Sequence, residues 1–196
     1  MSSLDLSFYQ RSTKKVAREL LGKKLVRVYR GHRIAGIITE VEAYLGVEDR
    51  AAHSYNNRRT KRTEAMYAIG GHSYIYFIYG MYHCFNVVTQ KQDVPEAVLV
   101  RALEPVEGIS LMQKFRKSKD MKNLTTGPGK LAQALHLTKK FNAVALNSNE
   151  LFLEDGISIP KSKIIQKPRI GVDYAGEHAS WPLRFYMKDN SYISKK

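Results

Sequence analysis

The chain has 196 residues, of which 32 are Lys or Arg and 18 are Asp or Glu, so its formal net charge is +14. With 43% hydrophobic and 26% charged residues it is typical of a globular protein, which argues against disorder throughout. One cysteine excludes an internal disulfide, and the absence of a long apolar run or a signal-peptide stretch favours an intracellular protein without membrane contact.

The first predicted element is a short amphipathic helix over residues 13–21. Val16, Leu20 and Leu21 recur at helical spacing. Gly22 follows them, where a C-terminal glycine ends a helix.

The stretch from Ile34 to Tyr44 predicts a strand with an unusual polar face. It is rich in β-branched residues, and a period of two places Glu40, Glu42 and Tyr44 on the same side. Because a carboxylate in an aromatic pocket can activate water, Glu42 is a candidate general base.

Residues 47–66 are polar, basic and turn-forming, so we expect an ordered loop with short helical turns. Two strands joined at Gly80 are predicted over residues 73–90. Seven of the twelve tyrosines lie between Tyr44 and Tyr82. Any one aromatic at strand spacing is more often part of a core, but this density beside a basic loop suits an unstacked base next to a phosphate backbone.

A third strand is predicted over residues 98–103, with Arg101 on one face between Leu99 and Leu103. A buried arginine can hold a carboxylate ionised and oriented, which makes Arg101 the expected partner of Glu42. An internal salt bridge without chemistry explains the pattern equally well.

The rest of the chain predicts two helices and further strands. One helix is expected to begin at Glu104 and Pro105 and another at Pro128. The last third is expected to hold strands marked by Phe152, Ile157, Ile159, Ile164 and Ile170 and ending at Arg184–Met187. With no linker or repeat to divide it, the chain over residues 1–196 predicts one α+β domain, a curved antiparallel sheet with helices around it.

Basic residues gather in three runs. Nine lie within residues 11–33, opposed only by Glu19, five lie within 50–62 with no acid, and five lie within 114–122. One such run is often a solvated face, but several favour a surface that follows phosphates. Charge alone leaves nucleic acid, acidic lipid headgroups and ribosomal surroundings as candidate partners.

Five stretches match one protein family in order. They are ITEVEAYLG from Ile38, followed by Glu48, Asp49 and AAHS; YIYFIYGMYHCFNVV from Tyr74; VLVRALEPVEG from Val98; GPGKLAQAL from Gly127; and AGEHASWPLRFY from Ala175. The chain closely resembles the alkyladenine DNA glycosylase family, also called the methylpurine or 3-methyladenine glycosylases, in its compact, bacterial-type form. The resemblance extends from about Leu6 to Met187.

The resemblance implies a hydrolytic reaction at Glu42. This residue would activate the attacking water, with Arg101 and a main-chain carbonyl near Val172 helping to position that water. A carboxylate near C1′ also stabilises the oxocarbenium-like charge that develops as an N-glycosidic bond breaks.

It also implies a pocket for the damaged base. Tyr44, His53 and Tyr76 would line this pocket and stack on a flipped purine, and His53 would hydrogen-bond to it. Asn86 would stand where the 2-amino group of guanine clashes.

The implied partner is double-stranded DNA containing alkylated or deaminated purines. Tyr79 would enter the duplex where the nucleotide left it, and Met81 would help to wedge the minor groove. Flipping costs a few kcal/mol, less for a damaged or mispaired base. We expect a cytoplasmic, nucleoid-associated monomer that needs no cofactor and no metal.

Three other functions compete with this one. A non-catalytic basic nucleic-acid-binding protein needs the charge and the aromatic residues, but not Glu42 with Arg101. A zinc-dependent base deaminase needs a paired Cys-x-x-Cys, which a chain with one cysteine cannot supply. A glycosylase that also breaks the strand needs a lysine or terminal amine as nucleophile, whereas the resemblance favours water.

Overall fold

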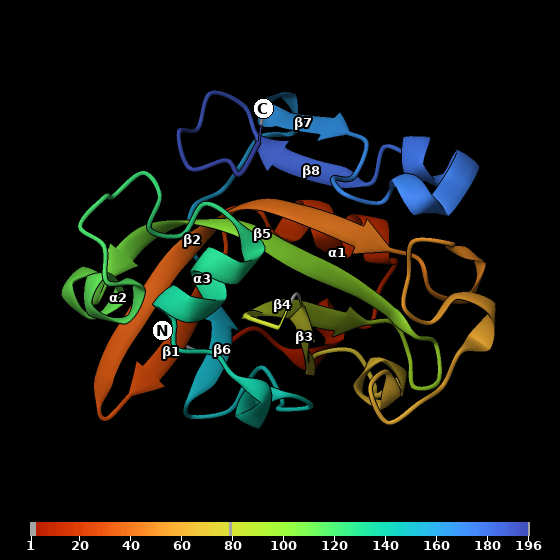
Figure 1. Cartoon of the computed structure of the whole chain (residues 1–196), viewed down its shortest axis with the longest axis horizontal. Coiled ribbons are helices and arrows are strands. Elements are labelled where there is room, and N and C mark those ends of the chain that lie inside the picture. The colour runs from red at the N-terminus through yellow and green to blue at the C-terminus, as the bar shows by residue number, and fades with distance from the viewer. Residues whose placement is uncertain (1–2, 79, 196) are drawn as a thin grey trace.

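The centre of the molecule is a curled antiparallel sheet built on two long strands. The structure, a computed structural model, describes residues 3–78 and 80–195. β2 (His32–Tyr44) pairs with β5 (Glu96–Glu107), and both strands cross the middle of the molecule (Figure 1). The other strands are β1 (Lys24–Tyr29), β3 (Ser73–Ile78), β4 (Tyr82–Thr89), β6 (Leu151–Glu154), β7 (Ile164–Lys167) and β8 (Arg184–Met187). Within the described residues the order is β3-β4-β5-β2-β1-β6, with β8 paired to β2 and β7.

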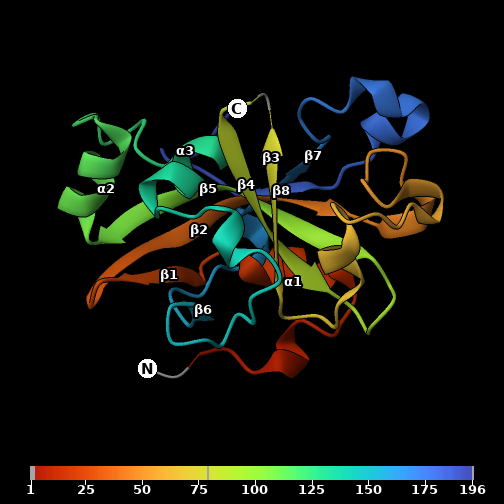
Figure 2. The ribbon, with the colours of Figure 1, turned by 60° about the horizontal axis from the view of Figure 1, so that its bottom comes forward.

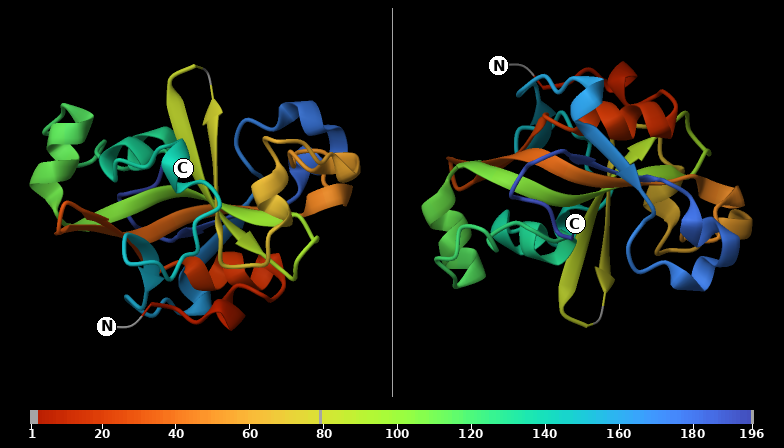
Figure 3. Two further views of the ribbon diagram at one scale, coloured as in Figure 1. Left: turned by 90° about the horizontal axis from the view of Figure 1, so that it is seen from below. Right: turned by 90° about the horizontal axis from the view of Figure 1, so that it is seen from above.

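Helices lie on both sides of this sheet. α1 (Thr13–Leu20) packs on one face, while the β3–β4 hairpin projects from the other face with α3 (Pro128–Ala134) beside it (Figures 2 and 3). α2 (Ile109–Arg116) follows β5 and packs against α3. The fully buried core side chains include Val16, Leu20, Ile38, Phe85, Leu103, Met112 and Leu131. The predicted α+β class is confirmed.

β2 and β5 change register where the polar side chains lie. The pairing shifts on either side of Glu40, and Arg101 falls within the irregular stretch of β5. Such bulges increase the local twist and redirect side chains. The opposite edge of β2 pairs with β8 over residues 40–42. Because β2 is buried on both faces from Ile34 to Ala43, its carboxylates point into the protein and not into water.

Several predicted elements are confirmed. The first helix spans Thr13–Leu20, and the hairpin turns at Gly80, where φ is +66°. Three short 3₁₀ helices interrupt the loop after β2, as expected: Gly46–Glu48, Tyr55–Asn57 and Glu64–Tyr67.

The prediction of a helix beginning at Glu104 and Pro105 is wrong. β5 continues to Glu107, and α2 begins only after Gly108, whose φ of +66° ends the strand. Pro105 lies opposite Gly36, where the strand pairing shifts register, so its missing N–H interrupts no regular ladder.

The strands expected around Ile157, Ile159 and Ile170 do not form in the described part of the chain. The segment that contains Ile157 passes alongside Gly22, and Ile157 N donates to the Gly22 carbonyl at 2.8 Å. Single contacts of this kind hold the segment without a strand ladder. No helix in residues 3–78 and 80–195 is long and apolar enough to cross a membrane.

A substitution at Gly36 tests how closely β2 and β5 pack against each other. A Cβ atom at Gly36 would lie 2.8 Å from Leu103 Cβ and 3.1 Å from the Glu104 carbonyl oxygen. We expect Gly36→Ala to lower the free energy of unfolding by about 1–3 kcal/mol, measured by urea denaturation. Val106→Ala, at a position of β5 that is 37% exposed, should change it by less than about 0.5 kcal/mol. Equal effects of the two variants would contradict this account of the packing.

Candidate active site

Glu42 is a buried carboxylate that receives hydrogen bonds from three donors. Its Oε2 accepts from Arg101 Nη1 at 3.2 Å and from the Tyr44 hydroxyl at 3.0 Å. Its Oε1 accepts from the backbone N–H of Ile170 at 2.7 Å. A carboxylate has about four lone-pair sites, so one acceptor site of Glu42 remains for another donor.

Arg101 joins Glu42 to a second buried carboxylate. Arg101 Nε donates to Glu40 Oε1 at 3.2 Å, and Arg184 Nε donates to the same oxygen at 2.7 Å. Burial acts to lower the pKa of Arg101, but the charges of Glu42 and Glu40 outweigh it and raise that pKa. Two carboxylates are thus balanced by two guanidinium groups inside the protein, as buried charges require.

A second buried ion pair holds the segment that covers Glu42. Arg169 Nη2 donates to Asp49 Oδ1 at 2.9 Å, and both side chains are fully buried. Arg169 also donates to the Ala43 carbonyl at 3.1 Å. Because Ile170 is next in the chain, this pair fixes the N–H group that meets Glu42.

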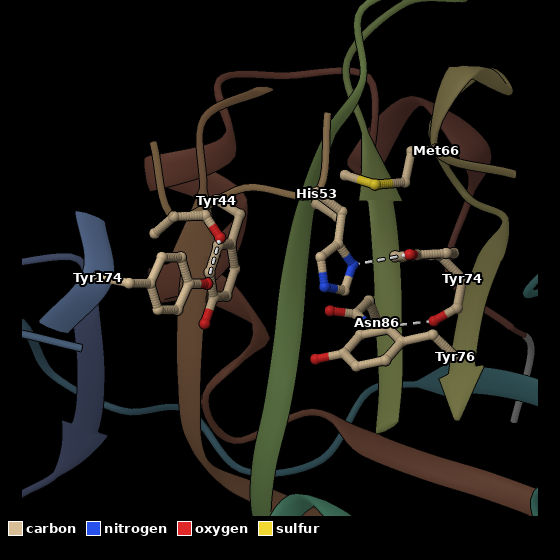
Figure 4. Close-up of a pocket in the computed structure, with 9 residues that line it drawn as sticks. Tyr44, His53, Met66, Tyr74, Tyr76, Asn86 and Tyr174 are labelled. Carbon is tan, nitrogen blue, oxygen red and sulfur yellow. Dashed lines mark hydrogen bonds between the residues drawn. The ribbon is translucent and has the colours of Figure 1, made fainter. Parts of the chain in front are cut away.

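Two adjoining cavities lie beside these charged residues. The smaller, of about 40 Å³, contains Asn86, and the larger, of about 410 Å³, contains Arg101 and Val172. Both are lined by Tyr44, His53, Tyr76 and Tyr174. In Figure 4, Tyr44 and Tyr174 lie on one side of the smaller cavity, and His53 and Tyr76 lie on the other.

His53 is held in this aromatic wall by Tyr74. Its Nδ1 lies 2.8 Å from the Tyr74 hydroxyl, and its ring meets Tyr76 edge-on at 4.6 Å. Burial lowers the pKa of His53 to about 4, helped by the charges of Arg62 and Arg58. The imidazole is therefore neutral at physiological pH, with Nδ1 occupied and Nε2 available.

The other predicted site residues lie around the cavities and on the hairpin. Asn86 Nδ2 donates to the Tyr74 carbonyl at 2.9 Å. Val172 is buried, and its carbonyl accepts from Ala175 N at 2.9 Å. Met81 is 67% exposed beside the turn of the hairpin, and Tyr79 falls outside the described residues.

Comparisons with known proteins identify the family of this chain. Residues 7–191 match the family model described as methylpurine-DNA glycosylase (MPG). The chain belongs to the methylpurine-DNA glycosylase family. It is therefore a DNA glycosylase, a hydrolase of N-glycosyl bonds, as the resemblance implied.

Full-length relatives show the same similarity. A protein of Clostridium novyi (strain NT) is 48% identical over 204 residues, covering 100% of both chains. One of Bacillus cereus (strain G9842) is 49% identical over 203 residues, covering 97% of this chain and 98% of its own. Both bear the name "Putative 3-methyladenine DNA glycosylase".

Several residues of this methylpurine-DNA glycosylase site have no role that the sequence alone predicts. Asp49 lies in a stretch that matched the family, but its partner Arg169 is 120 residues away. Glu40 was noted only as a second carboxylate on its strand. Tyr74 is one of many aromatic residues in its stretch. Tyr174, which is 71% exposed, lies in no helix or strand pattern that would mark it as a site residue.

The lowered pKa of His53 predicts a pH-dependent stability term. Between about pH 4 and pH 6.5 the unfolded chain binds a proton at His53 that the folded protein does not. This contribution to stability is fully present above pH 6.5 and is lost as the pH falls towards 4, by up to about 1.4 kcal/mol per pH unit.

Urea denaturation across this pH range measures the effect. The difference in free energy of unfolding between wild type and His53→Gln should follow that slope. His32→Gln, which removes an exposed histidine at the start of β2, is the control. A difference between wild type and His53→Gln that does not vary with pH would contradict the prediction.

Proposed function

We propose that this glycosylase flips damaged purines out of duplex DNA and hydrolyses their N-glycosidic bond with a water activated by Glu42. The substrates proposed are 3-methyladenine, 7-methylguanine, hypoxanthine and ethenoadenine, and the product is an abasic site. The observation that carries the proposal is the buried Glu42 carboxylate, with three donors on it and one acceptor site left, beside an aromatic cavity.

Glu42 acts on the water and on the sugar. Its remaining lone pair accepts a proton of the attacking water, and its negative charge stabilises the oxocarbenium-like sugar. Arg101 lines the larger cavity and keeps Glu42 oriented. The Val172 carbonyl has a second lone pair beyond its bond to Ala175 N, which would hold the other proton of the water.

The aromatic wall receives the base. Tyr44 and Tyr76 offer flat faces for stacking, and a methylated purine carrying positive charge gains cation–π attraction from them. His53 Nε2 faces the base while Tyr74 occupies Nδ1. A neutral imidazole suits this place, because an imidazolium would repel a cationic base.

Three further residues have proposed roles in recognition and flipping. Asn86, in the smaller cavity, would meet the exocyclic 2-amino group of guanine and reject that base. The hairpin that carries Met81 projects from the sheet (Figure 3), and Tyr79 and Met81 would enter the duplex from it. A tyrosine in the vacated space recovers about 1–3 kcal/mol of stacking.

The basic surface divides between two faces. Lys61, Arg62 and Lys139 line a hollow beside Tyr76, where they would meet phosphates near the flipped nucleotide. α1, which carries the exposed Lys14 and Lys15, lies on the opposite face of the sheet from the hairpin (Figure 3). A duplex held at the hairpin would therefore leave the α1 charges away from its backbone.

We further propose that residues 1–196 act as one monomeric domain in the cytoplasm, on the nucleoid. Alkylated and deaminated purines arise in chromosomal DNA, so the enzyme works where that DNA lies. Glu42 and Arg101 supply the charges that the reaction needs, which makes a cofactor unnecessary.

Replacing Glu42 tests the mechanism. Glu42→Gln should keep its affinity for lesion-containing duplexes and lower single-turnover base release by about 10²–10⁴-fold, because the amide cannot take a proton from water. Glu48→Gln, an exposed position in the same stretch, is the matched control. Wild-type rates in Glu42→Gln would remove Glu42 from the role of general base.

The assay uses one lesion per duplex and scores free base and strand breakage without alkali. A wild-type protein that binds but releases no base would indicate the non-catalytic alternative. Strand breakage without alkali would indicate a lyase.

The salt dependence of DNA binding tests which basic face contacts the duplex. The double variant Lys61→Gln/Lys139→Gln should reduce the slope of log affinity against log salt by about 1.8, since each phosphate contact contributes about 0.9. Lys14→Gln/Lys15→Gln on α1 should leave the slope unchanged. Equal effects of the two double variants would contradict the assignment of the DNA-binding face.

A further inference from the structure

The end of the chain folds back over β2 beside the buried carboxylates. We call residues 190–195 the C-terminal strap. Thr39 Oγ1 donates to the Tyr192 carbonyl at 2.6 Å, and Asn190 Nδ2 donates to Glu104 Oε2 at 3.0 Å. The strap is thus bound to both β2 and β5, the strands that carry Glu42 and Arg101.

Ser194 places two polar groups within the charged cluster. Its backbone N–H donates to Glu40 Oε2 at 2.6 Å. Its hydroxyl oxygen accepts from both Nε and Nη2 of Arg101, each at 3.3 Å. The next residue contributes as well, because the Lys195 carbonyl accepts from Arg184.

Ser194 provides an acceptor for Arg101 donors that the carboxylates leave without a partner. Nη1 is bonded to Glu42, Nε to Glu40 and Ser194, and Nη2 to Ser194. Arg101 is 8% exposed, so water does not replace a lost partner easily. Without the Ser194 hydroxyl, Nη2 would lack its acceptor, and the guanidinium would turn to satisfy it at the expense of Nη1.

Glu40 is fully buried and contacts Arg101, Arg184 and the strap. Glu42, by contrast, is bonded to Tyr44, which lines both cavities. Glu40 therefore connects the strap to Arg101 from the side away from Tyr44 and Ile170. Ser194 lies beyond the stretch 7–191 that matches the family model.

We propose that the C-terminal strap is a positioning element of the active site, in which Ser194 and Glu40 hold Arg101 in the orientation that aligns Glu42 with its water. The proposal rests on the proposed function of Glu42. It places Ser194 and Glu40 behind Arg101, where they affect the rate of bond cleavage and not the recognition of DNA.

The experiment compares two replacements of Ser194 in the full chain whose side chains have nearly the same shape and volume as each other. Ser194→Thr keeps the hydroxyl acceptor, and Ser194→Val lacks it. With a duplex containing one hypoxanthine and saturating enzyme, Ser194→Val should lower the single-turnover rate of base release by about 3- to 10-fold. Ser194→Thr should retain the wild-type rate, and Ser191→Val, at an exposed position of the same segment, should do the same.

A third replacement of Ser194 removes the bond to Glu40 as well. Ser194→Pro lacks both the hydroxyl and the backbone N–H, so its rate should fall by at least about 10-fold, further than that of Ser194→Val. The affinity of all variants for the same duplex should stay within about 2-fold of wild type, because the strap acts on cleavage alone. Melting temperatures identify any variant that fails to fold. If Ser194→Pro does not fold, the comparison of Ser194→Thr with Ser194→Val tests the role of the strap.

Three results would overturn the proposal. Equal rates for wild type and Ser194→Val would remove the hydroxyl from any positioning role. A loss shared by Ser194→Thr and Ser194→Val would show that shape and not the acceptor matters, and a loss of affinity at constant rate would make the strap a DNA contact. If wild type itself releases no base, the proposed function fails, and the role of the strap fails with it.

Discussion

The pairing of charges inside the sheet is the constraint on which the rest of this structure depends. Burying a carboxylate or a guanidinium without a partner costs several kcal/mol, so each such group needs an opposite charge at hydrogen-bond distance. The buried cluster meets this requirement with three carboxylates and three arginines, Glu40, Glu42, Asp49, Arg101, Arg169 and Arg184. Four of them, Glu40, Glu42, Arg101 and Arg184, form one network, and Asp49 with Arg169 forms a separate pair, so removing one member leaves its partner uncompensated.

This cluster explains the irregular architecture around β2. Glu40 and Glu42 share a face by ordinary alternation, and the register shifts beside Glu40 leave Arg101 in the irregular stretch of β5, where it reaches both carboxylates. Arg184 comes from β8, which pairs with β2 over residues 40–42. Arg169 comes from the segment between β7 and β8, and the strap follows β8. The last part of the chain thus supplies the partners of carboxylates that lie in the first part.

The aromatic cavity and the charged cluster are separate parts of the site that share residues. Tyr44 belongs to both, because its ring lines the cavities and its hydroxyl donates to Glu42. His53 stays neutral through burial and nearby arginines, while Glu42 keeps its donors on the other side of the same space. In the proposed function, the net charge of +14 attracts DNA and the cavity selects the base.

The sequence by itself determined several local elements and the pairing of Glu42 with Arg101. The helix over residues 13–20 and the turn at Gly80 follow from spacing between near neighbours, and the faces of two strands were enough to pair Glu42 with Arg101. The tertiary structure alone decided contacts between distant segments. Ser194 meets Glu40 across 154 residues, and no local pattern records that distance. Strand register and long-range ion pairs depend on how whole elements pack, because burial selects among pairings that are locally equivalent.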